Sequence, residues 1–216
     1  MNPWRRRGVP VRGSGDPPFY AFCRVVAALL IVPLYRYRAG GGEHVPDRGG
    51  VILAVSHKSW ADPVFAAMAF RRPLRFMAKS EVFANRLFGR FVTALGAFSI
   101  RRGAADVEAV RTALDIIASG GVLLMFPEGT RRHDDQIHEL HAGIGMLALR
   151  SGAPVIPVAL KGTRRLVSHR VPRFPSVRVN VGQAVDLSGL EGRKSEMYAA
   201  AAERIRAALR DLYVTL

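Results

Sequence analysis

Short apolar runs recur along the chain from residue 50 onward, each bounded by polar or turn-forming residues. They are mostly β-branched or aliphatic and nearly continuous rather than alternating, which is typical of strands covered on both faces of a sheet. The pattern predicts five strands, at residues 50–55, 74–78, 121–126, 155–160 and 177–181.

Segments with helical character separate these runs. The one at 62–70 begins with Asp-Pro, a good cap and first helical position, and those at 81–96 and 105–121 both close on glycine. The segment at 195–213 has an apolar stripe formed by Met197, Ala201, Ile205, Leu209 and Leu212. Strands that alternate with helices predict an α/β fold: a single domain over residues 39–216 with a mainly parallel, helix-covered mixed β-sheet.

Residues 1–38 have a different character. Their first half is basic and broken by proline and glycine, which predicts a loose basic arm. An apolar stretch from Val25 to Tyr35 follows, about half of the ~20 residues that a spanning helix needs, with aromatic and basic residues around it. No small-residue cleavage site of a signal peptide follows it. Two interpretations remain open: a first core helix, or the N-terminal membrane-associating helical segment, interfacial or re-entrant, that we favour.

The composition changes this picture mainly through charge. Of 216 residues, 49% are hydrophobic and 23% charged, both ordinary for a globular protein, but the net charge is +15. Such an excess favours polyanions: nucleic acid, an anionic membrane surface or phosphorylated substrates. A nucleic-acid-binding module would show aromatic residues interleaved with the arginines and a recognisable reading element, and the sequence shows neither, so we expect no nucleic acid partner.

The single cysteine, Cys23, allows no disulfide within the chain and no cysteine-based metal site. It leaves the compartment open, with a reducing cytosol the easier expectation.

A first candidate site follows the strand at 50–55. His57 lies at the carboxyl end of that strand, where open α/β folds bind ligands, and Asp62 comes five residues later. A turn between them can fold the carboxylate back onto the imidazole, which would fix the tautomer and leave the other ring nitrogen as a base. Spacing alone leaves open a plainer interpretation, in which Asp62 only caps the next helix and His57 is a polar strand end. Because no Gly-x-Ser-x-Gly elbow is present, the hydroxyl that His57 would deprotonate is expected to come from a substrate.

A second candidate site follows the strand at 121–126, at the same edge of the sheet. It consists of Glu128, Gly129, Thr130 and Arg131. Glutamate accepts hydrogen bonds, glycine lets a ligand approach the backbone, and the arginine fork matches a phosphate. Arg101 and Arg102, in a further segment before a helix, add positive charge. The plainer alternative is a turn with solvated surface arginines.

The remaining chemistry-bearing residues point to no further site. His133, His138 and His141 fall in a polar segment whose spacing matches no zinc signature, so we predict a solvated loop and no metal. No P-loop is present, so ATP chemistry lacks its usual phosphate cradle.

Together these motifs resemble those of the glycerolipid acyltransferases. His57 to Asp62 resembles the HxxxxD motif of that family, "GAFSIRR" its second block, "FPEGTR" its third and "VIPVAL" its fourth. The four blocks come in the family's order and cover roughly residues 40–165. HxxxxD alone is a weak signal and FPEGTR a strong one. Within the family, the pattern is most similar to the 1-acylglycerol-3-phosphate acyltransferases.

The resemblance implies a role for each matching residue. His57 would be the general base on the acceptor hydroxyl and Asp62 its orienting partner. Acyl transfer would proceed directly from acyl-CoA or acyl carrier protein to a lysophospholipid acceptor, with no cofactor beyond the acyl donor. The other implied roles concern substrate contacts.

The acceptor's phosphate would be held by Arg101, Arg102 and Arg131. Its glycerol part would be positioned by Glu128 and Gly129, with Thr130 beside them. Ile156 and Pro157 would shape the acyl pocket.

The resemblance also bears on location and on the acceptor. Lipid substrates imply a site at a bilayer surface, and we expect the cytoplasmic face of the cell membrane, with residues 1–38 as a peripheral or monotopic anchor. These residues hold seven arginines against one aspartate. One departure concerns headgroup choice: where the family often has Phe-Lys-x-Gly, this chain has "LHAG", so His141 replaces a lysine. Glycerol 3-phosphate, another lysophospholipid or a glycolipid therefore remains an alternative acceptor. A catalytically idle relative would be expected to lack one of the four motif residues His57, Asp62, Glu128 and Arg131, and all are present.

Overall fold

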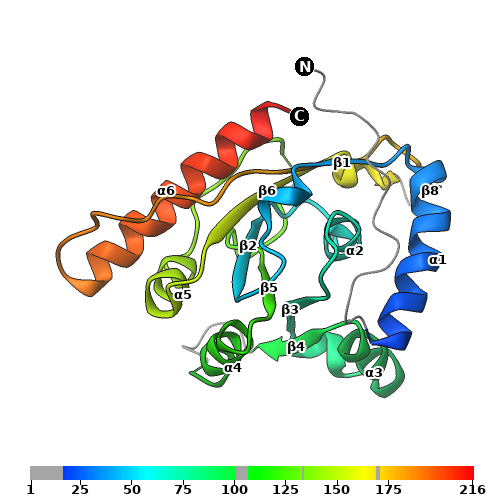
Figure 1. Cartoon of the computed structure of the whole chain (residues 1–216). Coiled ribbons are helices and arrows are strands. Elements are labelled where there is room, and N and C mark those ends of the chain that lie inside the picture. The colour runs from blue at the N-terminus through cyan, green and yellow to red at the C-terminus, as the bar shows by residue number, and fades with distance from the viewer. Residues whose placement is uncertain (1–16, 101–106, 133, 169–170) are drawn as a thin grey trace.

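A seven-stranded sheet forms the centre of the molecule (Figure 1). The computed structural model describes residues 17–100, 107–132, 134–168 and 171–216. The strand order is β1-β9-β6-β2-β5-β3-β4, and neighbours are parallel except for the β6–β9 pair. The strands are β1 (Arg38–Gly40), β2 (Val51–Val55), β3 (Leu74–Lys79), β4 (Ala97–Ile100), β5 (Val122–Met125), β6 (Val155–Lys161) and β9 (Arg178–Val181). A separate small ribbon pairs β7 (Val167–Ser168) with β8 (Val171–Pro172).

Helices cover both faces of this sheet (Figure 1). One face carries α1 (Pro18–Leu34) and α2 (Asp62–Ala67), and α3 (Arg86–Ala94) lies near the β4 edge beside the start of α1. The other face carries α4 (Val107–Ala118), α5 (Gly143–Ser151) and α6 (Lys194–Val214). Short 3-10 turns occur at η1 (Gly42–His44), η2 (Ser80–Phe83) and η3 (Thr163–Arg165). The predicted α/β class with a mainly parallel, covered sheet is confirmed.

Strand β2 shows how the sequence produces these three layers. All five of its residues are buried, and successive side chains point to opposite faces of the sheet. Val51, Leu53 and Val55 join the core cluster on the α1–α2 side, whereas Ile52 and Ala54 join the cluster under α4, α5 and α6. A continuous apolar run is therefore needed here, because a polar residue at any position would face one of the two cores.

Several elements differ from the sequence prediction. The expected helix at 81–96 is divided into η2 and α3, because Asn85 is extended and its side chain caps α3 by accepting from Leu87 N and Phe88 N. The sequence pattern also missed α5, β1 and β4. Strands β1 and β4 have only three and four residues, and pairing with β9 and β3 rather than local periodicity defines them.

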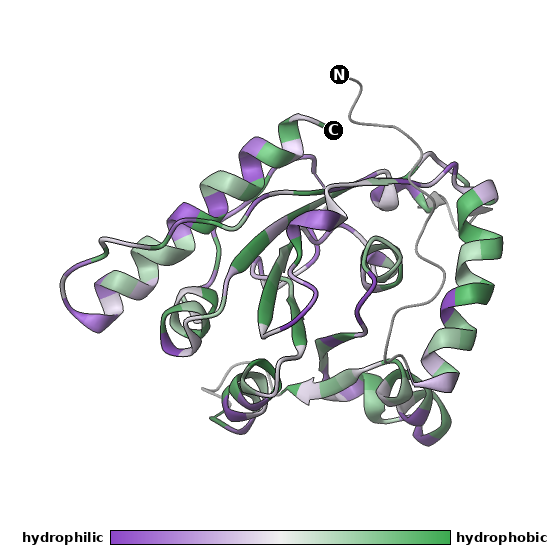
Figure 2. Ribbon diagram, viewed as in Figure 1, coloured by the Kyte–Doolittle hydropathy of each residue, from purple (hydrophilic) through white to green (hydrophobic). Residues whose placement is uncertain are grey.

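Helix α1 bears on whether the N-terminal segment is a core helix or a membrane-associating helix. Its residues Tyr20, Ala21, Arg24 and Ala28 are buried against the domain, and the Arg24 guanidinium donates to Arg71 O at 3.1 Å. The opposite side of the helix is apolar and exposed, and Figure 2 shows α1 as mostly hydrophobic along its length. The helix is thus packed on the domain, and its association with a membrane stays a prediction. Within the described ranges, no helix combines the length and the apolar character that crossing a bilayer requires.

Packing between α5 and α6 leads to a prediction about stability. A Cβ atom at Gly145 would lie 2.1 Å from Tyr198 O of α6, whereas one at Gly143, in the same helix, would meet nothing within 4 Å. We expect Gly145→Ala to lower the free energy of unfolding by roughly 1–3 kcal/mol through overpacking. Gly143→Ala should leave it unchanged or raise it slightly, because alanine favours helix. Chemical denaturation of both variants checks this, and equal midpoints would contradict the close helix contact.

Candidate active site

The turn between β2 and α2 is organised by one carboxylate. Asp62 Oδ2 accepts hydrogen bonds from His57 Nδ1 at 3.0 Å, from Lys58 N at 2.6 Å and from Ser59 N at 2.7 Å. Asp62 is fully buried and is the first residue of α2. The expected cap is therefore wrong in detail, because the carboxylate bonds the preceding turn and not the amides of its own helix. The contact between Asp62 and the imidazole is the one that the spacing allowed.

The His57 ring is held on a second side by an aromatic contact. It stacks on Phe126, which follows β5, with ring centroids 4.0 Å apart and an angle of 22° between the planes. The His57 side chain keeps 13% of its surface exposed. Because Nδ1 lies against a carboxylate, the hydrogen-bond network assigns the proton to Nδ1 and leaves Nε2 as an acceptor. The arrangement can take up a proton at Nε2 while the carboxylate stabilises the resulting cation.

Glu128 joins the two candidate sites through the backbone. Its Oε1 accepts from His57 N at 3.0 Å, and its side chain is fully buried. The carbonyl of the same residue is also bonded, because Arg132 N donates to His57 O at 3.0 Å. The segment after β5 therefore holds the backbone of the histidine from both directions. Glu128 thus supports the histidine in this structure, and its contact with a substrate stays a prediction.

Lys58 is a buried cation that the sequence analysis did not single out. Its ammonium lies 3.5 Å from Glu128 Oε2 and 3.9 Å from Asp134 Oδ1, and it donates to Gln136 O. Asp134 also bonds His138 Nε2 at 2.7 Å, and this hydrogen bond lowers the pKa of the Asp134 carboxyl. The signal in the sequence was the position of Lys58 next to His57, but only the fold shows that it points inward, towards the glutamate of the second motif.

Gly129 and His141 are close neighbours. Gly129 has a φ of +68°, and a Cβ there would lie 2.2 Å from His141 Nε2, so only glycine fits. His141 N in turn donates to Pro127 O at 2.9 Å. The histidine that replaces the family's usual lysine is therefore placed directly against the second motif. The predicted solvated loop thus packs partly on the site.

The other predicted site residues divide into three groups. Thr130 and Arg131 are exposed at the end of the second motif, and Arg101 and Arg102 lie outside the described residues. Ile156 and Pro157 are buried within β6, where they pair with Leu53 and Ala54 of β2, so the structure places them in the packed sheet. Among the described residues, no group of three or more His, Cys, Asp or Glu side chains could hold a metal ion.

A buried serine also contributes to the site without having been predicted. Ser56 Oγ accepts a hydrogen bond from Leu160 N at 2.9 Å, which ties the end of β2 to β6 just before His57. No Gly-x-Ser-x-Gly elbow surrounds Ser56. Its buried position and its backbone partner indicate a structural role.

The fold and the site define a class of protein: an α/β protein with a histidine–carboxylate pair at the carboxyl edge of a mainly parallel sheet. A family model described as "Acyltransferase" matches residues 36–161, more than half of the chain. The chain belongs to the acyltransferase family, and the prediction of an O-acyltransferase enzyme is confirmed.

Comparisons with individual proteins agree with this assignment. The chain is 29% identical over 205 residues to the 1-acyl-sn-glycerol-3-phosphate acyltransferase of Streptococcus pneumoniae, covering 89% of this chain and 72% of that protein. It is 34% identical over 119 residues to the lyso-ornithine lipid O-acyltransferase of Pseudomonas aeruginosa, covering 54% of this chain and 45% of that protein. The crystal structure of the 1-acyl-sn-glycerophosphate (LPA) acyltransferase PlsC from Thermotoga maritima has the same fold, with a TM-score of 0.62 and 23% identity over 89% of this chain and 81% of that one.

The buried pair of Lys58 and Glu128 leads to a prediction. Glu128→Gln keeps an acceptor for His57 N but leaves the ammonium without its nearest carboxylate, so we expect a loss of roughly 3–5 kcal/mol in the free energy of unfolding. Adding Lys58→Met should recover part of this loss, because the uncompensated charge is removed. Chemical denaturation measures both.

The matched control is Glu203→Gln, which breaks the exposed pair with Arg206 on α6 and should leave stability close to that of the wild type. If Glu128→Gln were as mild as this control, the buried pair would not be holding the two motifs together.

Proposed function

We propose that the protein transfers a fatty acyl group from acyl-CoA or an acyl carrier protein thioester to the sn-2 hydroxyl of 1-acylglycerol 3-phosphate, giving phosphatidic acid. The observation that carries this proposal is the His57–Asp62 pair, in which a buried carboxylate holds Nδ1 of a ring that is still partly exposed. The names of most of the similar proteins support this acceptor.

His57 would act as the general base of a direct transfer. Its Nε2 would take the proton of the acceptor hydroxyl as the oxygen attacks the thioester carbonyl carbon. The carbon–sulfur bond then breaks, and the proton passes from Nε2 to the departing thiolate. The Asp62 carboxylate would stabilise the imidazolium between these two proton transfers. No acyl-enzyme and no cofactor take part.

The acceptor's phosphate would be bound at the exposed end of the second motif. Arg131 supplies a guanidinium there, next to Thr130 and Gly129. A planar fork suits a phosphate bidentately. Arg101 and Arg102 are proposed to add to this site from the segment that follows β4, which ends at Ile100.

A second acceptor class deserves a test because one relative is named a lyso-ornithine lipid O-acyltransferase. His141, which lies against Gly129, occupies the place of a lysine in the family's usual pattern. A changed side chain beside the proposed headgroup site would alter the choice of headgroup. The same chemistry on a lysolipid without a phosphomonoester is therefore the alternative.

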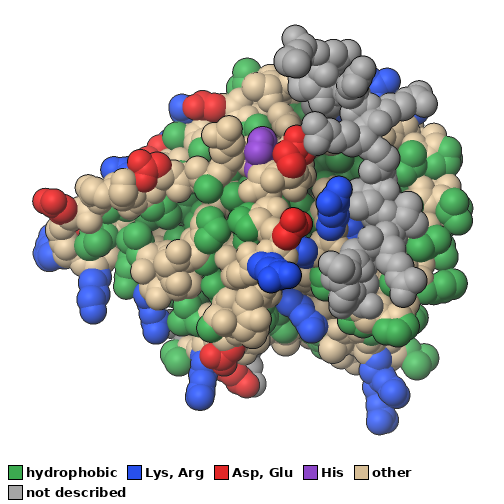
Figure 3. Space-filling view, viewed as in Figure 1, with side chains coloured by type: hydrophobic (Ala, Val, Ile, Leu, Met, Phe, Trp, Pro, Cys, Tyr) green, Lys and Arg blue, Asp and Glu red, His purple; other side chains and the backbone are tan. Residues whose placement is uncertain are grey.

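We also propose that α1 and α3 attach the protein to an anionic membrane surface, at the cytoplasmic face. Phe19 of α1 contacts Phe91 of α3 edge to face, with centroids 6.1 Å apart, which joins the two helices into one surface. We call this surface the apolar patch; its exposed hydrophobic residues are Phe19, Phe22, Val26, Leu29, Leu30, Leu34, Leu87, Phe88 and Phe91. Figure 3 shows hydrophobic side chains gathered along the edge of the molecule formed by α1.

Basic residues accompany the apolar patch. Arg86 and Arg90 are exposed on α3, next to the patch residues Leu87 and Phe91 of that helix. An apolar face combined with cationic side chains is the composition that favours binding in the plane of an anionic lipid interface. A site for lipid substrates on the same domain would then be held close to its substrates.

His57→Ala tests the proposed chemistry. We expect turnover to fall by at least about a hundredfold while the fold is retained, because the proton acceptor is lost. His44→Gln, a histidine at η1 remote in sequence from both motifs, should retain turnover. Acyl transfer is measured with full-length protein, and circular dichroism verifies folding. A His57→Ala protein with wild-type turnover would rule out the general base.

The acceptor is tested with the same protein, one acyl-CoA and a panel of lipids. The panel contains 1-acylglycerol 3-phosphate, glycerol 3-phosphate, a lysophospholipid, a lysoglycolipid and lyso-ornithine lipid, with products resolved by mass. Phosphatidic acid should be the main product. A preference for an acceptor without a phosphate would overturn the proposed acceptor but not the acyltransferase chemistry.

Paired substitutions in the apolar patch test the membrane proposal. Leu29→Ser with Leu30→Ser removes two exposed side chains of α1, whereas deleting the helix would also remove buried core residues. We expect the double variant to float poorly with phosphatidylglycerol vesicles, because less apolar surface is buried at the interface. The control is Val107→Ser with Val214→Ser, which changes equally exposed residues on α4 and α6. Equal flotation of the two variants would contradict the patch.

A further inference from the structure

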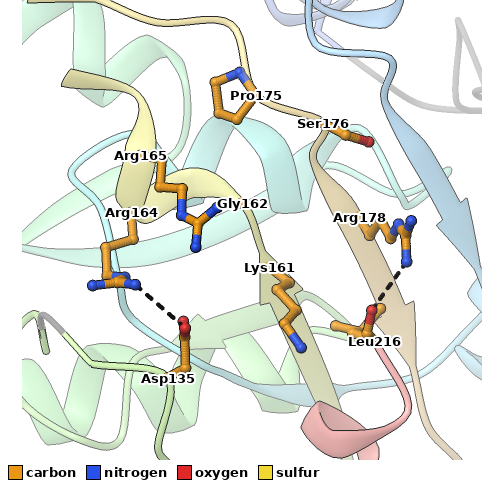
Figure 4. A pocket seen from close by; sticks show the side chains of 9 residues that line it. All are labelled: Asp135, Lys161, Gly162, Arg164, Arg165, Pro175, Ser176, Arg178 and Leu216. Atoms are coloured by element: carbon orange, nitrogen blue, oxygen red, sulfur yellow. Dashed lines mark hydrogen bonds and ion pairs between the residues drawn. The ribbon is translucent and has the colours of Figure 1, made fainter. Parts of the chain in front are cut away.

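A strongly basic pocket lies beyond the carboxyl end of β6, beside the start of β9 (Figure 4). Its hollow measures about 300 Å³, and its lining includes four cationic side chains and a single carboxylate. The cations are Lys161, Arg164, Arg165 and Arg178, and the carboxylate is Asp135. A concave site with this balance of charge is suited to a small, multiply charged anion.

The four cations differ in the hydrogen bonds and ion pairs that they form within the protein. Arg164 bonds Asp135 at 3.3 Å, and Arg178 donates to Leu216 O at 3.1 Å. Lys161 and Arg165 form no ion pair with any other residue in the described part of the chain. Figure 4 shows the Arg165 guanidinium pointing into the space between the labelled side chains, and the Lys161 side chain lying between those of Asp135 and Leu216. These two cations are therefore the ones that a bound anion would engage first.

The pocket lies close to the candidate active site but is separate from it. Val55 of β2 pairs with Val158 of β6, and three residues beyond this pair lie Lys58, in the turn after β2, and Lys161, at the end of β6. Arg178 pairs with Lys161 one strand further on. Neighbouring strands lie about 5 Å apart, so Lys161 of β6 lies roughly 5 Å and Arg178 of β9 roughly 10 Å to the side of β2.

Tyr213 connects the two regions. Its ring lies below the ammonium groups of Lys58 and Lys161, at 5.7 and 5.6 Å from the ring centroid. Its hydroxyl donates to Asp135 Oδ1 at 3.3 Å, and burial, followed by the nearby carboxylate of Asp135, raises the pKa of Tyr213. The phenol therefore stays neutral and adds no negative charge to the pocket.

We propose that this pocket binds the phosphate groups of coenzyme A, the small-molecule acyl donor. The inference rests on the proposed function, because it assigns a place to the donor of that reaction. Coenzyme A carries a phosphomonoester, about −1.5 to −2 at pH 7, and a diphosphate on the same nucleotide. Several cations around one hollow match that density of negative charge.

The position of the pocket favours the donor over the acceptor. The acceptor carries its phosphate on the carbon next to the reacting hydroxyl, so that phosphate must bind beside His57. The donor's phosphates are separated from its thioester by the whole pantetheine arm and must bind further away. The lining of the pocket includes no residue of the apolar patch, which separates it from the surface proposed to contact lipid. A carrier protein offers only one phosphodiester and needs a broad surface rather than a small hollow.

The test compares the full chain with the double variant Lys161→Gln, Arg165→Gln. Titration calorimetry at low salt measures the binding of coenzyme A, of adenosine 3′,5′-bisphosphate and of pantetheine, which lacks the phosphates. The control is Arg111→Gln with Arg150→Gln, which removes the same charge from exposed positions on α4 and α5. We expect the pocket variant to bind coenzyme A and the bisphosphate at least about tenfold more weakly than the control, with pantetheine unaffected. In turnover, KM for acyl-CoA should rise while KM for the acceptor and kcat stay unchanged.

The outcomes separate this inference from the proposed function. Coenzyme A that binds the pocket variant and the control equally, or does not bind the wild-type protein, overturns the inference even if the protein makes phosphatidic acid. A rise in the acceptor's KM alone would assign the pocket to the acceptor, and a loss of vesicle flotation alone would assign it to lipid headgroups; either overturns the donor site. Charge-dependent binding of coenzyme A without acylation of any lysolipid would uphold the pocket and overturn the proposed function.

Discussion

The carboxylate of Asp62 accepts three hydrogen bonds through one buried oxygen, and the geometry of the site depends on it. Two of the donors are backbone amides of the turn, and the third is the imidazole itself. A carboxylate buried in this way is stable only when such donors compensate for its lost hydration. The same bonds that make its burial possible therefore fix the turn and the ring together.

The sheet brings the two motifs to the same edge of the molecule. Because β2, β5 and β6 are parallel neighbours, their carboxyl ends meet at one edge, and the loops that follow them must pack on one another. The backbone of His57 is bonded on one side to Glu128 and on the other to Arg132, and Ser56 bonds the next strand. Residues about 70 and 100 positions apart thus form one rigid unit, which suits a reaction that requires exact alignment of a base and two substrates.

The candidate catalytic residues, the basic pocket and the apolar patch occupy different places on the domain. The buried ion pair of Lys58 and Glu128 lies beneath the turn, and the Tyr213 ring contacts both Lys58 and Lys161 of the basic pocket at the end of β6. Helix α1, in contrast, places one side against the α1–α2 core and leaves its apolar side open at the edge of the molecule. The histidine–carboxylate pair, the basic pocket and the apolar patch therefore lie on one small domain without sharing side chains.

The sequence by itself determined the fold class, because five apolar runs with intervening helices allow few arrangements other than a covered parallel sheet. It also determined that His57 and Asp62 could meet, since their separation is local. It did not reveal β1, β4 or α5, and it treated Asp62 as a cap of α2, whereas the carboxylate bonds the turn that precedes this helix. Only the tertiary structure decided that Glu128 and Lys58 face each other in the interior, that His141 packs on Gly129, and that Lys161 and Arg165 share a hollow. The physical reason is that periodicity and spacing report local geometry, whereas these contacts arise from strand register, which brings together residues that are distant along the chain.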